Sequence, residues 1–134
     1  MTGIPFIAIF LGMITIDGIT QPVLTVNITG LRNNTGKIML QVFDGKEKVI
    51  RQETGDIQNK TCSFVFRDLG PGKYAVRFYH DENLNGKMET NLVGKPAEGY
   101  GFSNNVTGKL GMPPFEKWLF DLNGNKMIEI KAVY

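Results

Sequence analysis

A run of oxygen-bearing side chains directly after the chain's only histidine is the clearest candidate for chemistry in the sequence. It reads Asp81-x-Asn83-x-Asn85-Gly86-x-x-Glu89. Oxygen ligands at alternate positions, followed by a glycine that permits a sharp reversal, suit a hard cation such as Ca²⁺, which collects about six to eight oxygens. Ca²⁺ is therefore the one cofactor that the sequence suggests. The candidate metal ligands are Asp81, Asn83, Asn85 and Glu89.

The pattern departs from a complete calcium loop at its end. A full calcium hand closes with a bidentate Glu, and this chain has Leu92 there. Asn in place of Asp also lowers the negative charge, so a site completed only by this loop should bind weakly. Glu98 and backbone carbonyl oxygens are further candidates to complete the coordination sphere. The alternative is that the Asp and Asn side chains form Asx-turns that hold the loop without any metal. The residues alone leave both interpretations open.

A second polar stretch, GYGFSNN at 99–105, combines aromatic rings with amide and hydroxyl groups. Rings beside hydrogen-bonding side chains can form a platform for a sugar or a peptide. The alternative, which we favour, is that the two rings plug an open end of the fold. As candidate ligand-binding residues we name His80, Tyr100, Phe102, Ser103, Asn104 and Asn105.

No residue is assigned a catalytic role from the sequence. His80 and Asp81 are neighbours in an expected strand, so their side chains point to opposite faces and cannot form a local dyad. By the same parity His80 shares a face with Val76 and Phe78, which favours a hydrogen-bonded histidine at the rim of the core. The chain has no nucleophile motif, phosphate loop or set of transition-metal ligands. A hydrolase that uses His80 with carboxylates of the loop is the alternative.

Strict alternation of apolar and polar residues predicts the strands that must position these groups. We expect three β-hairpins, at residues 23–43, 61–80 and 118–134, with at most a short strand at 49–52 and another within 99–108. Phe115 and Trp118 should anchor the core. About seven short strands and no convincing helix predict an all-β antiparallel β-sandwich, with a barrel as the main competitor.

Composition limits the size and the partners of the domain. The chain has 134 residues, 42% of them hydrophobic, and a formal charge of +2. This is enough for one domain, expected at 21–134, and the small, evenly spread charge argues against a nucleic-acid partner. Cys62, the only cysteine, shares a face with Phe64 and Phe66, which predicts an inert buried thiol.

The first twenty residues differ from the rest. Residues 4–16 (IPFIAIFLGMITI) are almost wholly apolar, about 20 Å as a helix, which is too short to span a bilayer. We expect residues 1–20 to be a signal peptide, although no basic residue precedes the run and no Ala-x-Ala site follows it. A retained membrane anchor and a first strand of the fold are the alternatives.

The longer runs of the sequence resemble a known family. LTVNITGLRNNTGKIMLQVFD at 24–44, HDENLNG at 80–86 and EGYGFSNN at 98–105 are similar to the bacterial domain-of-unknown-function family number 2141, small exported proteins. The resemblance covers about residues 23–132 and implies a bacterial source and an envelope or extracellular location, but no activity. The run LGPGKYAV at 69–76 resembles prealbumin-like domains, so the expected sandwich is immunoglobulin-like or prealbumin-like.

Together these features predict an exported, non-enzymatic binding or accessory domain that uses residues 80–105. We expect a periplasmic, cell-envelope or extracellular location, and an envelope or extracellular partner that the sequence does not identify. We expect neither nucleic-acid binding nor stable membrane insertion of the mature domain. Besides the hydrolase, a second alternative to the binding domain is a purely structural domain of the cell envelope.

Overall fold

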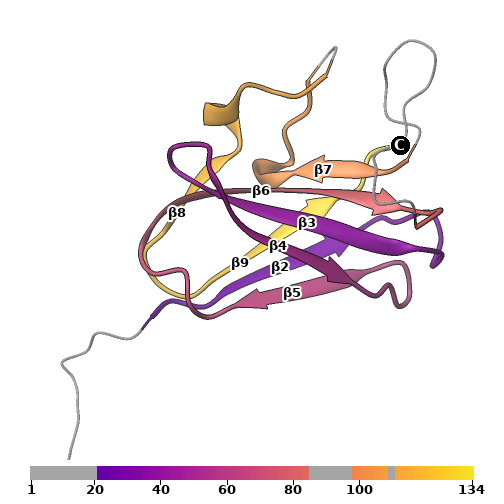
Figure 1. The fold of residues 1–134 in the computed structure, drawn as a ribbon, viewed down its shortest axis with the longest axis horizontal. Helices are drawn as coiled ribbons and strands as arrows, with labels where there is room; N and C mark the ends of the chain where they lie inside the picture. Colours follow the sequence, from indigo (N-terminus) through magenta and orange to yellow (C-terminus); the bar gives the residue numbers. More distant parts are fainter. Residues whose placement is uncertain (1–20, 85–97, 109–110) are drawn as a thin grey trace, which may run out of the picture.

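Two β-sheets packed face to face form the protein (Figure 1). The structure, a computed structural model, describes residues 21–84, 98–108 and 111–134. The smaller sheet has the order β5-β2-β9, and the larger has the order β4-β3-β6-β7, with β8 also paired to β6. The strands are β2 (Leu24–Thr29), β3 (Lys37–Asp44), β4 (Val49–Gly55), β5 (Cys62–Phe66), β6 (Gly72–Asp81), β7 (Tyr100–Phe102), β8 (Leu119–Leu122) and β9 (Lys126–Lys131).

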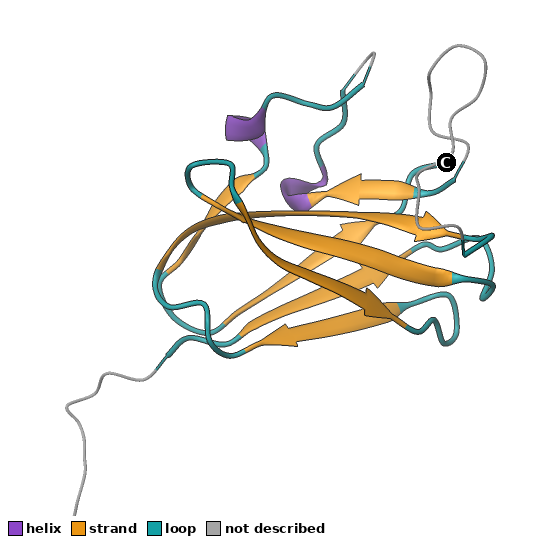
Figure 2. Ribbon diagram, in the orientation of Figure 1, coloured by secondary structure: helices purple, strands orange, loops and turns teal. Residues whose placement is uncertain are grey.

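The two remaining elements of the described chain are short 3₁₀ helices, η1 (Ser103–Asn105) and η2 (Phe115–Lys117), which Figure 2 shows outside the two sheets. The expected all-β sandwich is therefore confirmed. All strand pairs are antiparallel except that of β2 with β9, which run parallel.

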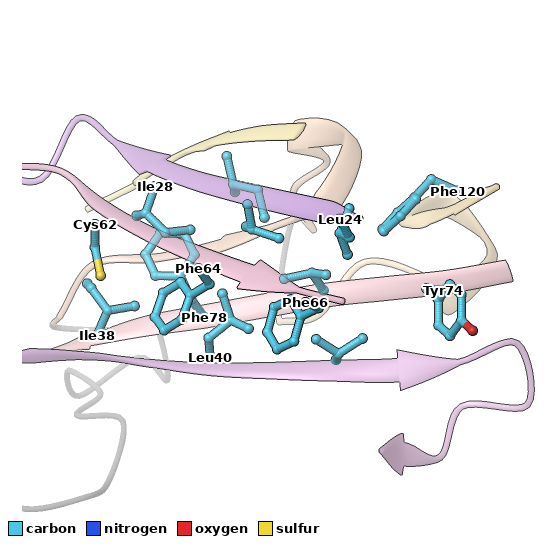
Figure 3. Packing of buried hydrophobic residues seen from close by; sticks show 14 of the residues in the cluster. Leu24, Ile28, Ile38, Leu40, Cys62, Phe64, Phe66, Tyr74, Phe78 and Phe120 are labelled. Carbon is cyan, nitrogen blue, oxygen red and sulfur yellow. The ribbon is translucent and has the colours of Figure 1, made fainter. Parts of the chain in front are cut away.

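Alternating residues place one face of each strand in the core, as the sequence predicts. The inward residues of β2 are fully buried and those of β5, with Cys62 among them, nearly so, while the residues between them are more exposed. Burial raises the pKa of the Cys62 thiol to about 11. Figure 3 shows side chains from both sheets filling the shared space. The largest of them include Leu24, Ile28, Ile38, Leu40, Phe64, Phe66 and Phe78.

The three hairpins predicted from the sequence are wrong. β2 pairs with β5 and β9, and β3 pairs with β4 and β6, so the turn at 30–36 crosses from one sheet to the other. The chain crosses again between β4 and β5, between β5 and β6, and between β8 and β9. Alternation shows that a strand has one buried face, but two strands facing each other across a core have the same pattern as two strands side by side. The hairpin that does form is β3 with β4.

The crossing from β5 to β6 is fixed by a tyrosine at the start of β6. The hydroxyl of Tyr74 donates to the carbonyl oxygens of Leu69 and, at 2.9 Å, of Gly70. A tyrosine that bonds back to the backbone just upstream of its strand is the tyrosine corner of immunoglobulin-like sandwiches. The run that suggested a hairpin is therefore an inter-sheet corner.

A second, smaller hydrophobic cluster lies on the outer face of the larger sheet. Phe43 and Ala75 point away from the main core and pack with Phe102 and Trp118. The Trp118 ring is fully buried, and its centroid lies 4.9 Å from that of Phe102 and 5.2 Å from that of Phe43. The segment that carries η2 thus covers part of this outer face, and Trp118 is an anchor as predicted, although of this second cluster. Within the described ranges, no helix has the length and apolar character needed to cross a membrane.

Candidate functional site

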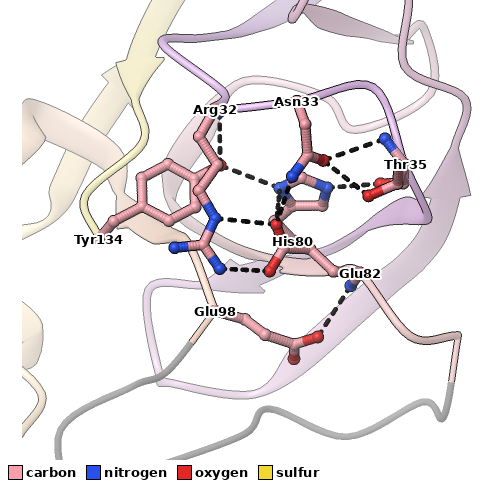
Figure 4. A network of polar contacts seen from close by, with 7 residues as sticks. All are labelled: Arg32, Asn33, Thr35, His80, Glu82, Glu98 and Tyr134. Carbon is pink, nitrogen blue, oxygen red and sulfur yellow. Dashed lines mark hydrogen bonds and ion pairs between the residues drawn. The ribbon is translucent and has the colours of Figure 1, made fainter.

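His80 lies at the end of β6 and is sealed inside a polar network (Figure 4). It is 0% exposed, and both ring nitrogens have partners. Nε2 lies 2.6 Å from the carbonyl oxygen of Thr35, and Nδ1 lies 2.9 Å from the hydroxyl of Tyr134. A carbonyl oxygen can only accept, so in the neutral ring the proton is on Nε2 and Nδ1 accepts from Tyr134. His80 is therefore the hydrogen-bonded histidine that the sequence favoured.

Glu82 ties the same network to the turn between β2 and β3. Its carboxylate accepts from Arg32 Nε at 2.9 Å and Nη2 at 2.5 Å, and from Asn33 Nδ2 at 2.8 Å. The hydrogen bond from Arg32 is the main reason that the pKa of Glu82 falls to about 2. A carboxylate held by a bidentate guanidinium and an amide stays ionised and fixed in place. Glu82 is thus committed to a structural contact.

The structure describes two of the four predicted metal ligands. Asp81 is 3% exposed at the end of β6, and Asn83 follows in the turn. Asn85 and Glu89 lie outside the described residues. Glu98, the further oxygen that the sequence offered, is 3% exposed and accepts a hydrogen bond of 2.8 Å from the backbone N–H of Glu82. In residues 21–84, 98–108 and 111–134, no group of three His, Cys, Asp or Glu side chains is arranged to hold a metal.

The two glycines of the GYGF run allow β7 to lie directly on the core. A Cβ on Gly101 would come within 2.5 Å of Phe78 and 2.7 Å of Ile130, and one on Gly99 within 2.5 Å of the Tyr134 ring. Tyr100 exchanges backbone hydrogen bonds with Val133, which joins the two sheets at this edge. The glycines of this segment therefore face the core, whereas the rings of Tyr100 and Phe102 belong to the cluster on the outer face of the larger sheet and do not plug an end of the sandwich.

The polar residues after β7 are used as clamps. The Ser103 hydroxyl donates to the carbonyl of Trp118 and accepts from the N–H of Val76. The Asn104 amide donates to the carbonyl of Leu119 at 2.8 Å and to that of Lys117 at 3.1 Å. The Ser103 hydroxyl and the Asn104 amide nitrogen thus hold the segment before β8 against the larger sheet.

Asn105 clamps the other sheet. Its amide donates to the carbonyl of Glu129 at 3.1 Å and accepts from the N–H of Lys131 at 2.8 Å, as a neighbouring strand would. Beside this contact lies an open groove of about 480 Å³ between β7, η1 and the free edge of β9. Two candidate ligand-binding residues, Phe102 and Asn105, line it together with Gly101, Val106, Thr107, Glu129, Lys131, Ala132 and Val133.

The structure therefore divides the predicted ligand-binding residues. His80, Ser103 and Asn104 have structural roles, Tyr100 lies on the outer face of β7 opposite Tyr79, and the other two line the groove. Sequence reasoning missed Arg32 and Tyr134, which complete the network around His80. Neither had a sequence signal, because one is in a turn, the other follows the last strand, and only the fold brings them to β6.

A family model matches most of the chain. The family is DUF2141, described as an uncharacterized protein conserved in bacteria, and the match covers residues 26–130. This span runs from β2 to β9 and includes every residue of the network except Tyr134. No curated protein matches the chain.

Proposed function

The chain belongs to this family of uncharacterised bacterial proteins, and on that premise we propose that it is an exported, non-enzymatic binding or accessory domain that takes a ligand in the groove beside β9. The groove carries the proposal. Its volume is in the range of small-ligand sites, and its lining combines apolar side chains with a few polar ones.

The state of His80 supports a role without catalysis. A general base must reach a substrate proton, directly or through one water. His80 is fully buried, and its two nitrogens are held by Thr35 and Tyr134. The carboxylate of Glu82, the nearest one in the described part of the chain, lies 4.0 Å from Nδ1 and is bound by Arg32. The hydrolase alternative would need this network to come apart.

The rigidity of the groove supports binding. The Asn105 amide fixes one wall to β9, and the Tyr100 to Val133 backbone pair fixes its end. A preformed surface does not lose much conformational entropy when it takes a ligand, so a modest contact area can give useful affinity.

Thermal shift with a panel of oligosaccharides, peptides and fatty acids tests the groove. A ligand that binds only the folded protein raises the free energy of unfolding, by about 2.7 kcal/mol at a hundredfold excess over its Kd. We expect at least one class to raise the Tm of the wild type. Thr107→Trp, which places a large ring on an exposed wall of the groove, should remove that rise.

Val65→Trp is the matched control, because Val65 is exposed on β5 and does not line the groove. It should leave the rise unchanged. No rise with any class, or a rise that Thr107→Trp leaves intact, contradicts the groove proposal.

An activity assay addresses the hydrolase alternative. Wild type and His80→Gln are incubated with p-nitrophenyl esters, phosphates and glycosides at neutral pH. We expect both to stay at the rate of the buffer alone. A wild-type rate above background that His80→Gln loses while retaining its fold would establish the enzyme instead.

Export is proposed from the apolar run at 4–16 and is tested separately. Residues 1–30 are fused to an alkaline phosphatase that lacks its own leader and becomes active only outside the cytoplasm. The proposal expects phosphatase activity in intact bacteria, and loss of that activity when Ile9→Asp and Leu11→Asp interrupt the run. An inactive fusion at normal expression contradicts export.

A further inference from the structure

Arg77 occupies the centre of the outer face of the larger sheet. Its neighbours along β6, Val76 and Phe78, are buried in the sandwich core, so parity places Arg77 on the opposite side. In register it lies between Gln41 on β3 and Phe102 on β7. This is the border between the part of the face covered by Trp118 and the part carrying Tyr79 and Tyr100.

Arg77 has no carboxylate partner among the residues that the structure describes. Nε donates to Gln41 Oε1 at 2.7 Å, and Cζ lies 5.1 Å from the centroid of the Phe43 ring. Nη1 points at the sulfur of Met112 at 3.4 Å, which is a weak acceptor. The ion pairs between Arg or Lys and a carboxylate in the described chain involve other residues, namely Arg32, Lys37, Arg51 and Lys73.

This arrangement leaves strong donors turned toward solvent. The two N–H groups of Nη2 have no hydrogen-bond acceptor among the described residues. Every fully buried side-chain nitrogen and oxygen among those residues does have a partner, so Nη2 is not fully buried. The Nη2 donors therefore retain contact with water. Partial burial nevertheless lowers the pKa of the guanidinium, since it removes part of the hydration of the charge. A partly desolvated guanidinium gains most from a carboxylate, which it can bind with two parallel hydrogen bonds.

The side chains around Arg77 are of the types found at the centre of protein interfaces. Tyr79 and Tyr100 lie opposite each other on β6 and β7, both half-buried, and Met112 is 53% exposed. Tyr, Arg and Met are enriched at such centres. Among the residues in described positions, the direct neighbours of Arg77 on this face carry no acidic group, and the nearby carboxylates of Asp81 and Glu98 are each 3% exposed.

We propose that Arg77, with Tyr100 and Met112 beside it, is the docking point for an acidic peptide segment of a partner protein. A Glu or Asp carboxylate of that segment replaces the Met112 sulfur at the guanidinium, and an adjacent apolar side chain lies on the Tyr100 ring. The inference rests on the proposed binding role of the domain, but it uses a different surface from the groove.

Fluorescence anisotropy with a matched pair of labelled peptides tests the proposal. The probe is a short peptide of alternating Glu and Tyr, and its control alternates Gln and Tyr. We expect saturable binding of the Glu peptide to the full domain and at least about tenfold weaker binding of the Gln peptide. Equal affinity for the two peptides, or no binding of the Glu peptide, overturns the proposal.

Substitutions locate the contact. Arg77→Gln should weaken binding of the Glu peptide by at least about tenfold, whereas Arg67→Gln, at an exposed arginine after β5, should leave it within about twofold. Unchanged binding by a folded Arg77→Gln variant contradicts the proposal. Binding of a sulfated oligosaccharide that depends on Arg77, without binding of the Glu peptide, would identify the ligand as a polysaccharide. That result would also overturn the proposal of an acidic peptide.

Met112→Glu gives an independent test if Arg77→Gln does not fold. It places a carboxylate from the chain itself where the sulfur now meets Nη1, so it should raise the Tm and abolish binding of the Glu peptide. Met112→Gln, of the same shape without the charge, should keep binding. Peptide binding that survives Met112→Glu contradicts the proposal. If the peptide tests fail but a ligand of the groove still raises the Tm, the proposed binding function stands and only the Arg77 docking point is wrong. If both the peptide tests and the groove tests fail, the proposed binding function is wrong as well.

Discussion

The ring of His80 and the hydroxyl of Tyr134 are joined by a hydrogen bond of 2.9 Å, although 54 positions separate them in the chain. The same hydroxyl accepts from the backbone N–H of Arg32 at 3.0 Å. One phenol thus links the turn before β3, the end of β6 and the segment after β9. This explains how the chain's only histidine can be fully buried without an unsatisfied nitrogen.

Tyr134→Phe should lower the free energy of unfolding by about 1 to 2 kcal/mol, because it leaves His80 Nδ1 without its donor and the Arg32 N–H without its acceptor. Chemical denaturation with an unchanged m-value measures this. Tyr100→Phe removes the same group where it makes no hydrogen bond to a described residue, and should change stability by less than about 0.5 kcal/mol. Equal effects of the two variants contradict the role given to Tyr134.

Glu82 should make stability depend on pH in the acid range. Its folded pKa is lowered to about 2 from an ordinary value of 4.5. Its contribution is therefore fully present above pH 4.5 and is lost as the pH falls from 4.5 toward 2. Because the Arg32 side chain is 48% exposed, water screens the pair and the contribution is about 1 to 2 kcal/mol.

Thermal unfolding of wild type and Glu82→Gln from pH 7 to pH 2 measures that contribution. The difference in stability should be largest near pH 7 and should shrink below pH 4.5. Glu116→Gln, which removes the charge of an exposed carboxylate in η2, makes the same change in net charge and serves as the control. A difference between wild type and Glu82→Gln that stays constant to pH 2 is incompatible with the network in Figure 4.

The sequence predicted the strands better than their partners. Alternation located β2, β3, β5 and β6 because each has one face in the core. It did not show that successive strands lie in different sheets, since the hydrophobic period is the same in both arrangements. The parallel pairing of β2 with β9 depends on contacts between the two ends of the domain, which no local pattern carries.

Gly101→Ala should destabilise the domain by about 1 to 3 kcal/mol, since the added methyl group would overlap the Phe78 ring and Ile130 and push β7 off the core. Calorimetry or denaturant unfolding gives the value. Gly124→Ala is the matched control, because nothing lies within 4 Å of a Cβ at that position. If Gly101→Ala is as stable as Gly124→Ala, β7 does not close the sandwich as described.

The polar candidates show a second limit of sequence reasoning. Asn104 and Asn105 have the amide groups expected of a ligand platform, yet both bond to backbone groups of neighbouring segments. An amide that recognises a peptide edge in the same chain is chemically identical to one that recognises a ligand. Only the position of β9 and of the segment before β8 distinguishes the two uses.

Calcium binding by Asp81, Asn83, Asn85 and Glu89 stays a prediction. Addition of about 10 mM Ca²⁺ should raise the Tm, EDTA should reverse the rise, and Asp81→Ala should abolish it. Mg²⁺ at the same concentration serves as the control for ionic strength. A Tm that does not respond to Ca²⁺, in the wild type and in Asp81→Ala alike, would falsify the metal interpretation and favour Asx-turns.

We propose that the protein binds its ligands through accessible surface while His80 stays buried in its polar network. The most direct test is an NMR titration of the ¹⁵N-labelled domain with the ligand class that raises its Tm. We expect the amide signals of Gly101, Asn105, Thr107 and Lys131 to shift and those of His80 and Glu82 to stay in place. Shifts centred on His80 and Glu82, accompanied by conversion of the ligand to a product, would contradict it.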